Sequence, residues 1–155
     1  MRVGEISGLL LLCFAASAAD GQAQTLRAEI QLAQTVVKND EDILITTTIR
    51  NTGAAEETLV VWTCSYPAQW RSDNPDVRVN QVACMQNVPG KVKLRPGETF
   101  TRPVHVHVAP KAPELPRSVP FRLGYGTDAY FGTIEPAPKV PVIWSNAVTV
   151  HIVPK

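Results

Sequence analysis

Two histidines on a predicted strand are the residues of this chain best placed to bind a metal ion. His105 and His107 are separated by one residue, and alternate side chains of a strand project from the same face. Their imidazoles could share a copper or zinc ion. The third histidine, His151, is expected on the outer surface of an opposing sheet, too far away to join them. The sequence leaves open a two-histidine metal site or a pair of solvated strand residues.

The cysteines suggest a different kind of sulfur chemistry. Cys13 lies in a segment that we expect to be removed, which leaves Cys64 and Cys84. An even pair in an exported protein is most simply a disulfide. This bond would close a loop of about 20 residues and disfavour the unfolded chain by roughly 3 kcal/mol. Two zinc-binding thiolates are the alternative, but such a site needs four donors and no histidine lies between the two cysteines.

No group of residues has the spacing of an active site. The chain lacks a G-x-S-x-G nucleophile elbow, and the paired carboxylates Glu56 and Glu57 lie in a predicted solvent-facing turn. Gly124 and Gly126 lack the strand-to-helix setting in which glycines bind phosphate. We therefore expect a protein without enzymatic activity and without a cofactor.

Aromatic residues in two predicted loops are the candidates for binding. Tyr130 and Phe131 lie in a long proline-bearing loop over residues 126–141, and Tyr66 and Trp70 lie in a loop over residues 65–76. Loops on a rigid scaffold often carry recognition, and aromatic residues dominate interface hot spots. We predict a contact surface at Tyr130 and Phe131. For Tyr66 and Trp70, packing beneath the disulfide and exposure as a binding surface both remain open.

Alternation of aliphatic and polar residues defines the strands that must position these groups. The organising strand covers residues 43–50, where Ile43, Ile45 and Ile49 recur with a period of two. Further strands are predicted over residues 25–37, 58–62, 77–82, 88–94, 100–108, 119–125 and 143–153. Val60 and Trp62 share the parity of Cys64, so we expect these side chains to face inward.

Seven or eight strands separated by turns, with no amphipathic helix, predict an all-β fold of two packed antiparallel sheets. The turn at residues 51–53 and the Leu-Arg-Pro-Gly-Glu turn at residues 94–98 resemble those of exported bacterial immunoglobulin-like domains. More distantly, they resemble BsuPI-type proteinase inhibitors. The resemblance implies an immunoglobulin-like β-sandwich over residues 25–155. It also implies extracellular protease inhibition as an alternative function, although Thr63-Cys64-Ser65 replaces the glycine-and-aromatic strand of the inhibitors.

The N-terminal residues predict export. An apolar block over residues 9–19 follows Arg2 and contains Ala16-Ser17-Ala18, an A-x-A cleavage site. The block is shorter than the roughly 20 residues needed to cross a bilayer. We predict a signal peptide over residues 1–18, or to residue 23, and a secreted or periplasmic protein with no membrane span after cleavage. A buried first helix and lipid attachment at Cys13 are the alternatives.

The charge balance narrows the class of partner. Fifteen basic and fourteen acidic residues give a formal charge of +1, which is too little to steer the chain onto nucleic acid. We expect a non-catalytic domain that recognises a protein or another macromolecule of the cell envelope through its end loops. A periplasmic metal-binding protein using His105 and His107, and an extracellular protease inhibitor, are the alternatives.

Overall fold

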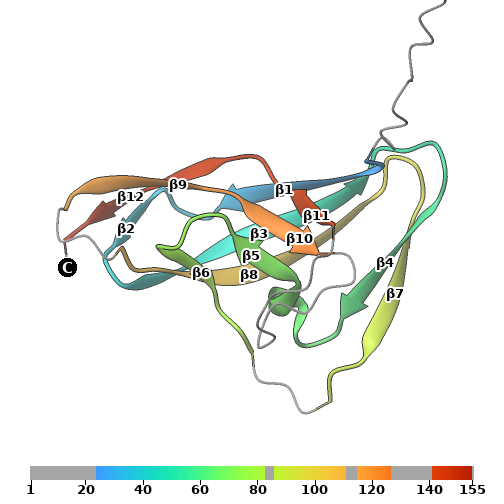
Figure 1. The fold of residues 1–155 in the computed structure, drawn as a ribbon, viewed down its shortest axis with the longest axis horizontal. Coiled ribbons are helices and arrows are strands. Elements are labelled where there is room, and N and C mark those ends of the chain that lie inside the picture. The colour runs from blue at the N-terminus through green and yellow to red at the C-terminus, as the bar shows by residue number, and fades with distance from the viewer. Residues whose placement is uncertain (1–23, 83–85, 111–114, 127–140, 155) are drawn as a thin grey trace, which may run out of the picture.

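Two layers of strands pack face to face and enclose the apolar core (Figure 1). The computed structural model describes residues 24–82, 86–110, 115–126 and 141–154. One layer is a four-stranded sheet in the order β1-β3-β8-β6. Its strands are β1 (Leu26–Leu32), β3 (Glu41–Asn51), β8 (Thr99–Val108) and β6 (Val77–Val79). The fold is the predicted all-β, immunoglobulin-like sandwich.

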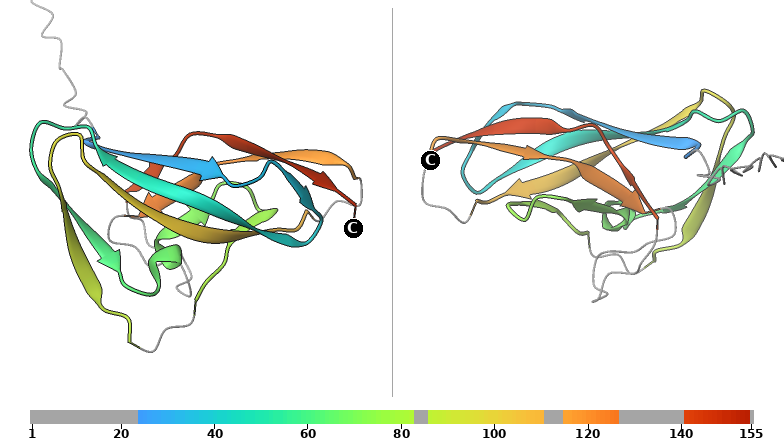
Figure 2. Two further views of the ribbon diagram at one scale, coloured as in Figure 1. Left: turned by 180° about the vertical axis from the view of Figure 1, so that it is seen from behind. Right: turned by 45° about the horizontal axis from the view of Figure 1, so that its top comes forward.

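The facing layer consists of two three-stranded sheets, which lie opposite the first layer (Figure 2). One contains β2 (Val36–Lys38), β12 (Val148–Val153) and β9 (Arg117–Phe121). The other contains β11 (Val142–Trp144), β10 (Leu123–Gly126) and β5 (Trp70–Ser72). Among the described residues, no helix is long and apolar enough to span a membrane.

A two-stranded sheet stands off one end of the sandwich (Figures 1 and 2). It pairs β4 (Glu57–Trp62) with β7 (Pro89–Leu94) in antiparallel register. We call this sheet the β4–β7 arm. A 3-10 helix, η1 (Tyr66–Gln69), lies between β4 and β5 in the chain and packs beside the Trp62 end of β4.

The organising strand and its neighbour are confirmed. In β3 the side chains of Ile43, Ile45, Thr47 and Ile49 are buried, and those of the residues between them lie on the outer face. Val104 and Val106 of β8 are buried opposite Ile45 and Ile43. Branched side chains suit this pleated, half-buried surface, so the alternation in sequence was sufficient to locate both strands.

Three of the predicted strands are interrupted. Residues 25–37 form β1 and then β2, which leaves the first layer and pairs in parallel with β12. Residues 119–125 change sheets at Arg122, and residues 143–153 change sheets between Trp144 and Val148. Two hydrogen bonds between Ser145 and Leu123 link the places where these two segments change sheets. The Ser145 amide donates to the Leu123 carbonyl (2.9 Å), and the Ser145 hydroxyl accepts from the Leu123 amide (3.1 Å). These interruptions, together with β5 in the segment that was predicted as a loop, give twelve strands in the described residues rather than seven or eight.

The predicted orientation of β4 is wrong. Leu59 and Val61 are buried against the core, whereas Val60 and Trp62 are half-buried on the other face. All four residues from 59 to 62 are apolar, so alternation could not distinguish the two faces. Cys64 follows the end of β4, where the strand geometry no longer fixes its direction.

Candidate binding surface

His107 lies between two carboxylates at the end of the sandwich away from the arm. Its Nδ1 is 2.8 Å from Asp42 Oδ1, and its Nε2 is 3.1 Å from Asp40 Oδ1. Hydrogen bonds from Asn80 and His107 lower the pKa of Asp42. Both ring nitrogens therefore already interact with acidic groups, and a metal ion would have to displace one of them.

His105 is exposed on the same strand, and His151 Nδ1 lies 2.8 Å from Ser118 Oγ in the other layer. The described residues contain no group of three or more His, Cys, Asp or Glu side chains arranged to hold a metal ion. A metal site at His105 and His107 stays a prediction.

Tyr66 and Trp70 are buried in the core. The alternative that they form an exposed binding surface is therefore wrong. Their exposed fractions are 2% and 1%. Their rings meet edge to face at 6.1 Å, and Trp70 contacts Tyr125 at 5.1 Å. The Tyr66 hydroxyl also lies 2.9 Å from Thr47 Oγ1. The helix η1 turns these rings inward, which local sequence did not reveal.

The other predicted contact residues, Tyr130 and Phe131, lie outside the described residues. The base of their loop is described, however. Tyr125 in β10 is buried, and its hydroxyl donates a 3.1 Å hydrogen bond to the Val60 carbonyl of β4. The strand that leads into the loop therefore contacts the arm.

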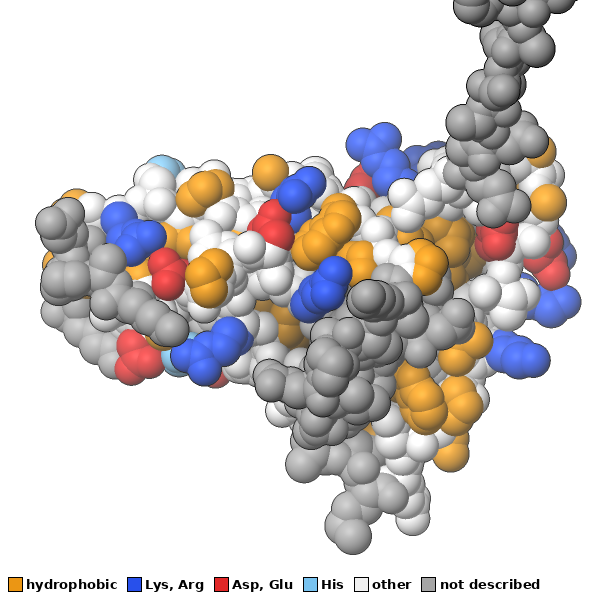
Figure 3. All heavy atoms as spheres, in the orientation of Figure 1, with side chains coloured by type: hydrophobic (Ala, Val, Ile, Leu, Met, Phe, Trp, Pro, Cys, Tyr) orange, Lys and Arg blue, Asp and Glu red, His pale blue; other side chains and the backbone are white. Residues whose placement is uncertain are grey.

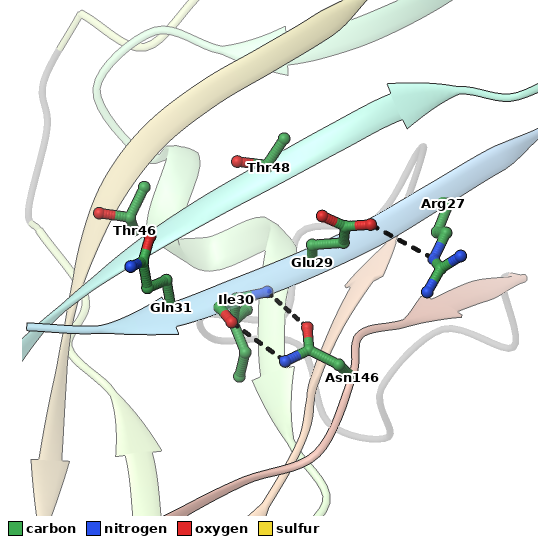
Figure 4. Close-up of a pocket in the computed structure, with 7 residues that line it drawn as sticks. All are labelled: Arg27, Glu29, Ile30, Gln31, Thr46, Thr48 and Asn146. Carbon is green, nitrogen blue, oxygen red and sulfur yellow. Dashed lines mark hydrogen bonds and ion pairs between the residues drawn. The ribbon is translucent and has the colours of Figure 1, made fainter. Parts of the chain in front are cut away.

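A shallow polar pocket of about 250 Å³ lies on the outer surface of β1 and β3 (Figure 4). An Arg27–Glu29 ion pair (3.4 Å) lies at one side, and Asn146 lies at the other. The Asn146 amide accepts from the Ile30 amide (2.8 Å) and donates to the Ile30 carbonyl (3.1 Å), so it covers the backbone edge of β1. The two charged groups offset each other, and the pocket offers no concentrated charge to a ligand.

A buried amide holds the β4–β7 arm near Trp62, at the end away from the turns that join it to β3 and β8. Gln69 has an exposed fraction of 0%; its Oε1 accepts from the Trp62 amide (3.0 Å) and its Nε2 donates to the Val60 carbonyl (2.8 Å). These two bonds replace those that a neighbouring strand would make with β4. Leu59 and Val61 add apolar contacts on the inner face. The arm is therefore a fixed part of the fold.

The outer face of the arm combines apolar and basic side chains. Cross-strand pairs place Trp62 beside Pro89, Val60 beside Lys91 and Thr58 beside Lys93. Pro89, Lys91 and Lys93 are exposed, and Val60 and Trp62 are half-buried. Figure 3 shows hydrophobic side chains gathered on the surface of this part of the molecule. We call these six residues the arm face: Thr58, Val60, Trp62, Pro89, Lys91 and Lys93.

The arm face was missed because Val60 and Trp62 were expected to point inward. The signal available in the sequence was the alternation of Lys91 and Lys93 with Val92 and Leu94. This alternation fixes the inner face of β7, but the partner of β7 had to be known before Trp62 could be placed beside it.

The sequence matches no protein-family model and no curated protein. Solved structures with similar folds include Spo0M, a sporulation control protein from Bacillus subtilis (TM-score 0.46, 11% identity, 86% of this chain and 51% of that chain). A FixG-related protein from Vibrio parahaemolyticus has a TM-score of 0.40 and 11% identity (86% and 99% covered). The CARDB domain of PF1109 from Pyrococcus furiosus has a TM-score of 0.38 and 15% identity (84% and 96% covered). The chain thus spans about half of the Spo0M structure, and these similarities concern strand arrangement alone.

Proposed function

We propose that this protein is an exported, non-catalytic β-sandwich domain that binds a protein or another macromolecule of the cell envelope through one end of the sandwich. The observation that carries the proposal is the β4–β7 arm. It stands off the sandwich, is fixed by Gln69, and presents Trp62 and Pro89 beside Lys91 and Lys93. Tryptophan is one of the residue types enriched in interface hot spots.

The loop over residues 126–141 is the second part of the proposed surface. Because Tyr125 contacts β4, the loop starts beside the arm. Tyr130 and Phe131 lie outside the described residues, and their part in binding follows from the expectation that loops on a rigid scaffold carry recognition.

Export through a signal peptide over residues 1–18 is part of the proposal, together with a Cys64–Cys84 disulfide. The described neighbours of Cys64 support this pairing. The Cys64 Sγ lies 3.7 Å from the Gln86 carbonyl, and Ser65 contacts Asn87 through its amide and its hydroxyl. The segment that follows Cys84 in the chain therefore returns to Cys64.

Binding can be tested by site-specific cross-linking in the exported fraction. A photoreactive residue replaces Thr58, an exposed residue of the arm face, in the full chain, and cross-linked partners are compared between wild type, Trp62→Ala, and the double variant Tyr130→Ala/Phe131→Ala. Thr149→Ala, an exposed change on β12, is the matched control. We expect loss of a specific partner with either aromatic variant and not with the control.

The alternative function, protease inhibition, is tested by adding a panel of secreted proteases to the same assay.

Equal cross-linking in all four proteins, with unchanged folding by circular dichroism, would contradict the proposed surface.

A further inference from the structure

The outer edge of β7 has unused strand-pairing capacity. The Thr63 amide donates to the Val88 carbonyl (3.1 Å), so this residue pair is hydrogen-bonded across the arm. Antiparallel pairs alternate between hydrogen-bonded and non-hydrogen-bonded. The Val60–Lys91 and Thr58–Lys93 pairs are therefore of the second kind, which agrees with the Val60 carbonyl pointing away from β7 toward Gln69. The amides and carbonyls of Lys91 and Lys93 consequently point outward.

Two other strand edges of the fold are closed by side-chain amides. Gln69 covers β4, and Asn146 covers β1. Within the described part of the chain, no side chain or strand makes hydrogen bonds to the outward backbone groups of Lys91 and Lys93. Pro89 has no amide hydrogen and ends this edge on one side. What remains is a short edge on a fixed arm that projects from the molecule.

We propose that the outer edge of β7 binds an extended segment of a partner protein by strand addition, and that this segment alternates acidic with aliphatic residues. The inference rests on the proposed binding function and narrows the class of partner. Backbone pairing with Lys91 and Lys93 supplies the affinity, as in other cases of strand addition. Side chains of the added strand supply the specificity.

The alternation follows from the two faces of β7. Lys91 and Lys93 share one face, so neighbouring residues of an added strand on that face are complementary when acidic. Val92 is half-buried on the other face, where aliphatic neighbours extend the apolar surface. Glu56 lies 3.0 Å from Lys93 Nζ, but both groups are well exposed, and such a pair exchanges readily for another carboxylate.

The same charges disfavour a second copy of this chain as the occupant. Pairing two β7 edges would bring Lys91 and Lys93 of both copies together on neighbouring strands, and like charges there repel. Lysines on an edge strand commonly prevent such self-association. The edge is thus selective for an acidic strand.

The test uses the ¹⁵N-labelled full chain and a synthetic peptide of about eight residues that alternates Glu with Val. We expect saturable shifts of the Lys91 and Lys93 amide signals and slower hydrogen exchange at both amides. Lys91→Glu should weaken binding roughly tenfold, whereas Lys38→Glu, an exposed lysine on β2, should leave it unchanged. A peptide with Gln in place of Glu should bind the wild-type chain about as weakly as the Glu-Val peptide binds the Lys91→Glu variant.

Peptides that are N-methylated at alternate positions separate backbone pairing from simple charge attraction. Methylation of the peptide amides that pair with β7 should abolish binding, and methylation of the intervening amides should preserve it. Equal binding of the two methylated peptides, or no shift of the Lys91 and Lys93 amide signals, would overturn strand addition. Concentration-dependent dimers of the chain in sedimentation would assign the edge to self-association instead. If the peptide fails while Trp62→Ala still removes the cross-linked partner, only this inference is lost and the proposed function stands.

Discussion

At the residue scale, Asn51 joins the two turns from which the arm rises. Its side chain has no exposed surface, and Nδ2 donates to the carbonyls of Ala55 (2.7 Å) and Leu94 (2.8 Å). Its Oδ1 accepts from the Gly53 amide (2.8 Å). The backbone amide of Asn51 also donates a hydrogen bond to the Glu98 carbonyl (3.0 Å). One buried amide therefore fixes the turns at residues 51–57 and 94–98 to each other.

Asn51→Ala should lower the free energy of unfolding by about 2–4 kcal/mol, because it leaves one buried and two partly buried backbone groups without partners. Urea denaturation of both proteins measures this difference. Thr52→Ala is the control, since Thr52 is exposed and its hydroxyl makes one bond, to the Thr25 carbonyl (2.9 Å). It should cost less than about 1 kcal/mol. Similar losses in the two variants would contradict the role given to Asn51.

Tyr66 makes stability depend on pH in the alkaline range. Burial raises the pKa of Tyr66 from 10.0 to about 12. As the pH rises above 10, the unfolded chain loses this proton first, so the free energy of unfolding falls until the folded pKa is reached. The full loss is roughly 3 kcal/mol, and below pH 10 the group has no effect on the pH dependence.

Tyr66→Phe should remove that alkaline slope. Its stability should be lower at neutral pH by about 1 kcal/mol, because the hydrogen bond with Thr47 is lost. Urea denaturation at several pH values from 8 to 12 provides the measurement. If wild type and variant lost stability in parallel above pH 10, the buried hydroxyl would not be the cause.

At the element scale, two strand edges are each covered by a side-chain amide, one of which is buried and the other exposed. Gln69 pairs with β4 in the core, and Asn146 pairs with β1 at an exposed position. Water can replace a lost partner at an exposed edge but not at a buried one. The two amides should therefore differ in their contribution to stability although their hydrogen bonds are alike.

Gln69→Leu should lower the free energy of unfolding by about 2–4 kcal/mol and speed hydrogen exchange of the Trp62 amide. Asn146→Ala, the matched change on β1, should cost about 1 kcal/mol or less and affect the Ile30 amide alone. Urea denaturation and hydrogen exchange monitored by NMR check both values. An equal cost in the two variants would show that burial does not decide the effect.

The elements also show where strand signals in the sequence stop being informative. Alternation located β3 and β8 because each has one buried face. The run from Leu59 to Trp62 is apolar throughout, and its orientation was decided by Gln69 and by the core beneath Leu59. The change of sheet at Arg122 left no turn residue in the sequence, so β9 and β10 were predicted as one strand.

At the scale of the whole molecule, the predicted disulfide would tie β4 to the segment that leads into β7. These strands are paired with each other and with no other strand of the described residues. The bond would therefore restrain the arm in addition to the unfolded chain. Lys91 and Lys93 would keep their position relative to Trp62 even when the outer edge is bound.

Peptide mapping of exported protein without reductant should find Cys64 linked to Cys84. Reduction should lower the free energy of unfolding by roughly 3 kcal/mol, as expected for a loop of about 20 residues, and Cys64→Ser/Cys84→Ser should reproduce this loss. Complete alkylation of both thiols before reduction would contradict the bond. The same mapping identifies the first residue of the exported chain and tests cleavage after Ala18.

The sequence by itself determined the fold class, the positions of β3 and β8, and the turn that places Gly97 at a φ of 83°. These features depend on side-chain periodicity and local backbone preferences, which are properties of neighbouring residues. Tertiary structure alone decided which face of β4 is buried, that β7 is its partner, and that Tyr66 and Trp70 lie in the core. Those outcomes depend on contacts between residues far apart in the chain, such as Gln69 with Val60 and Tyr125 with Val60. The candidate binding surface is built from such contacts, so it could not be found from the sequence.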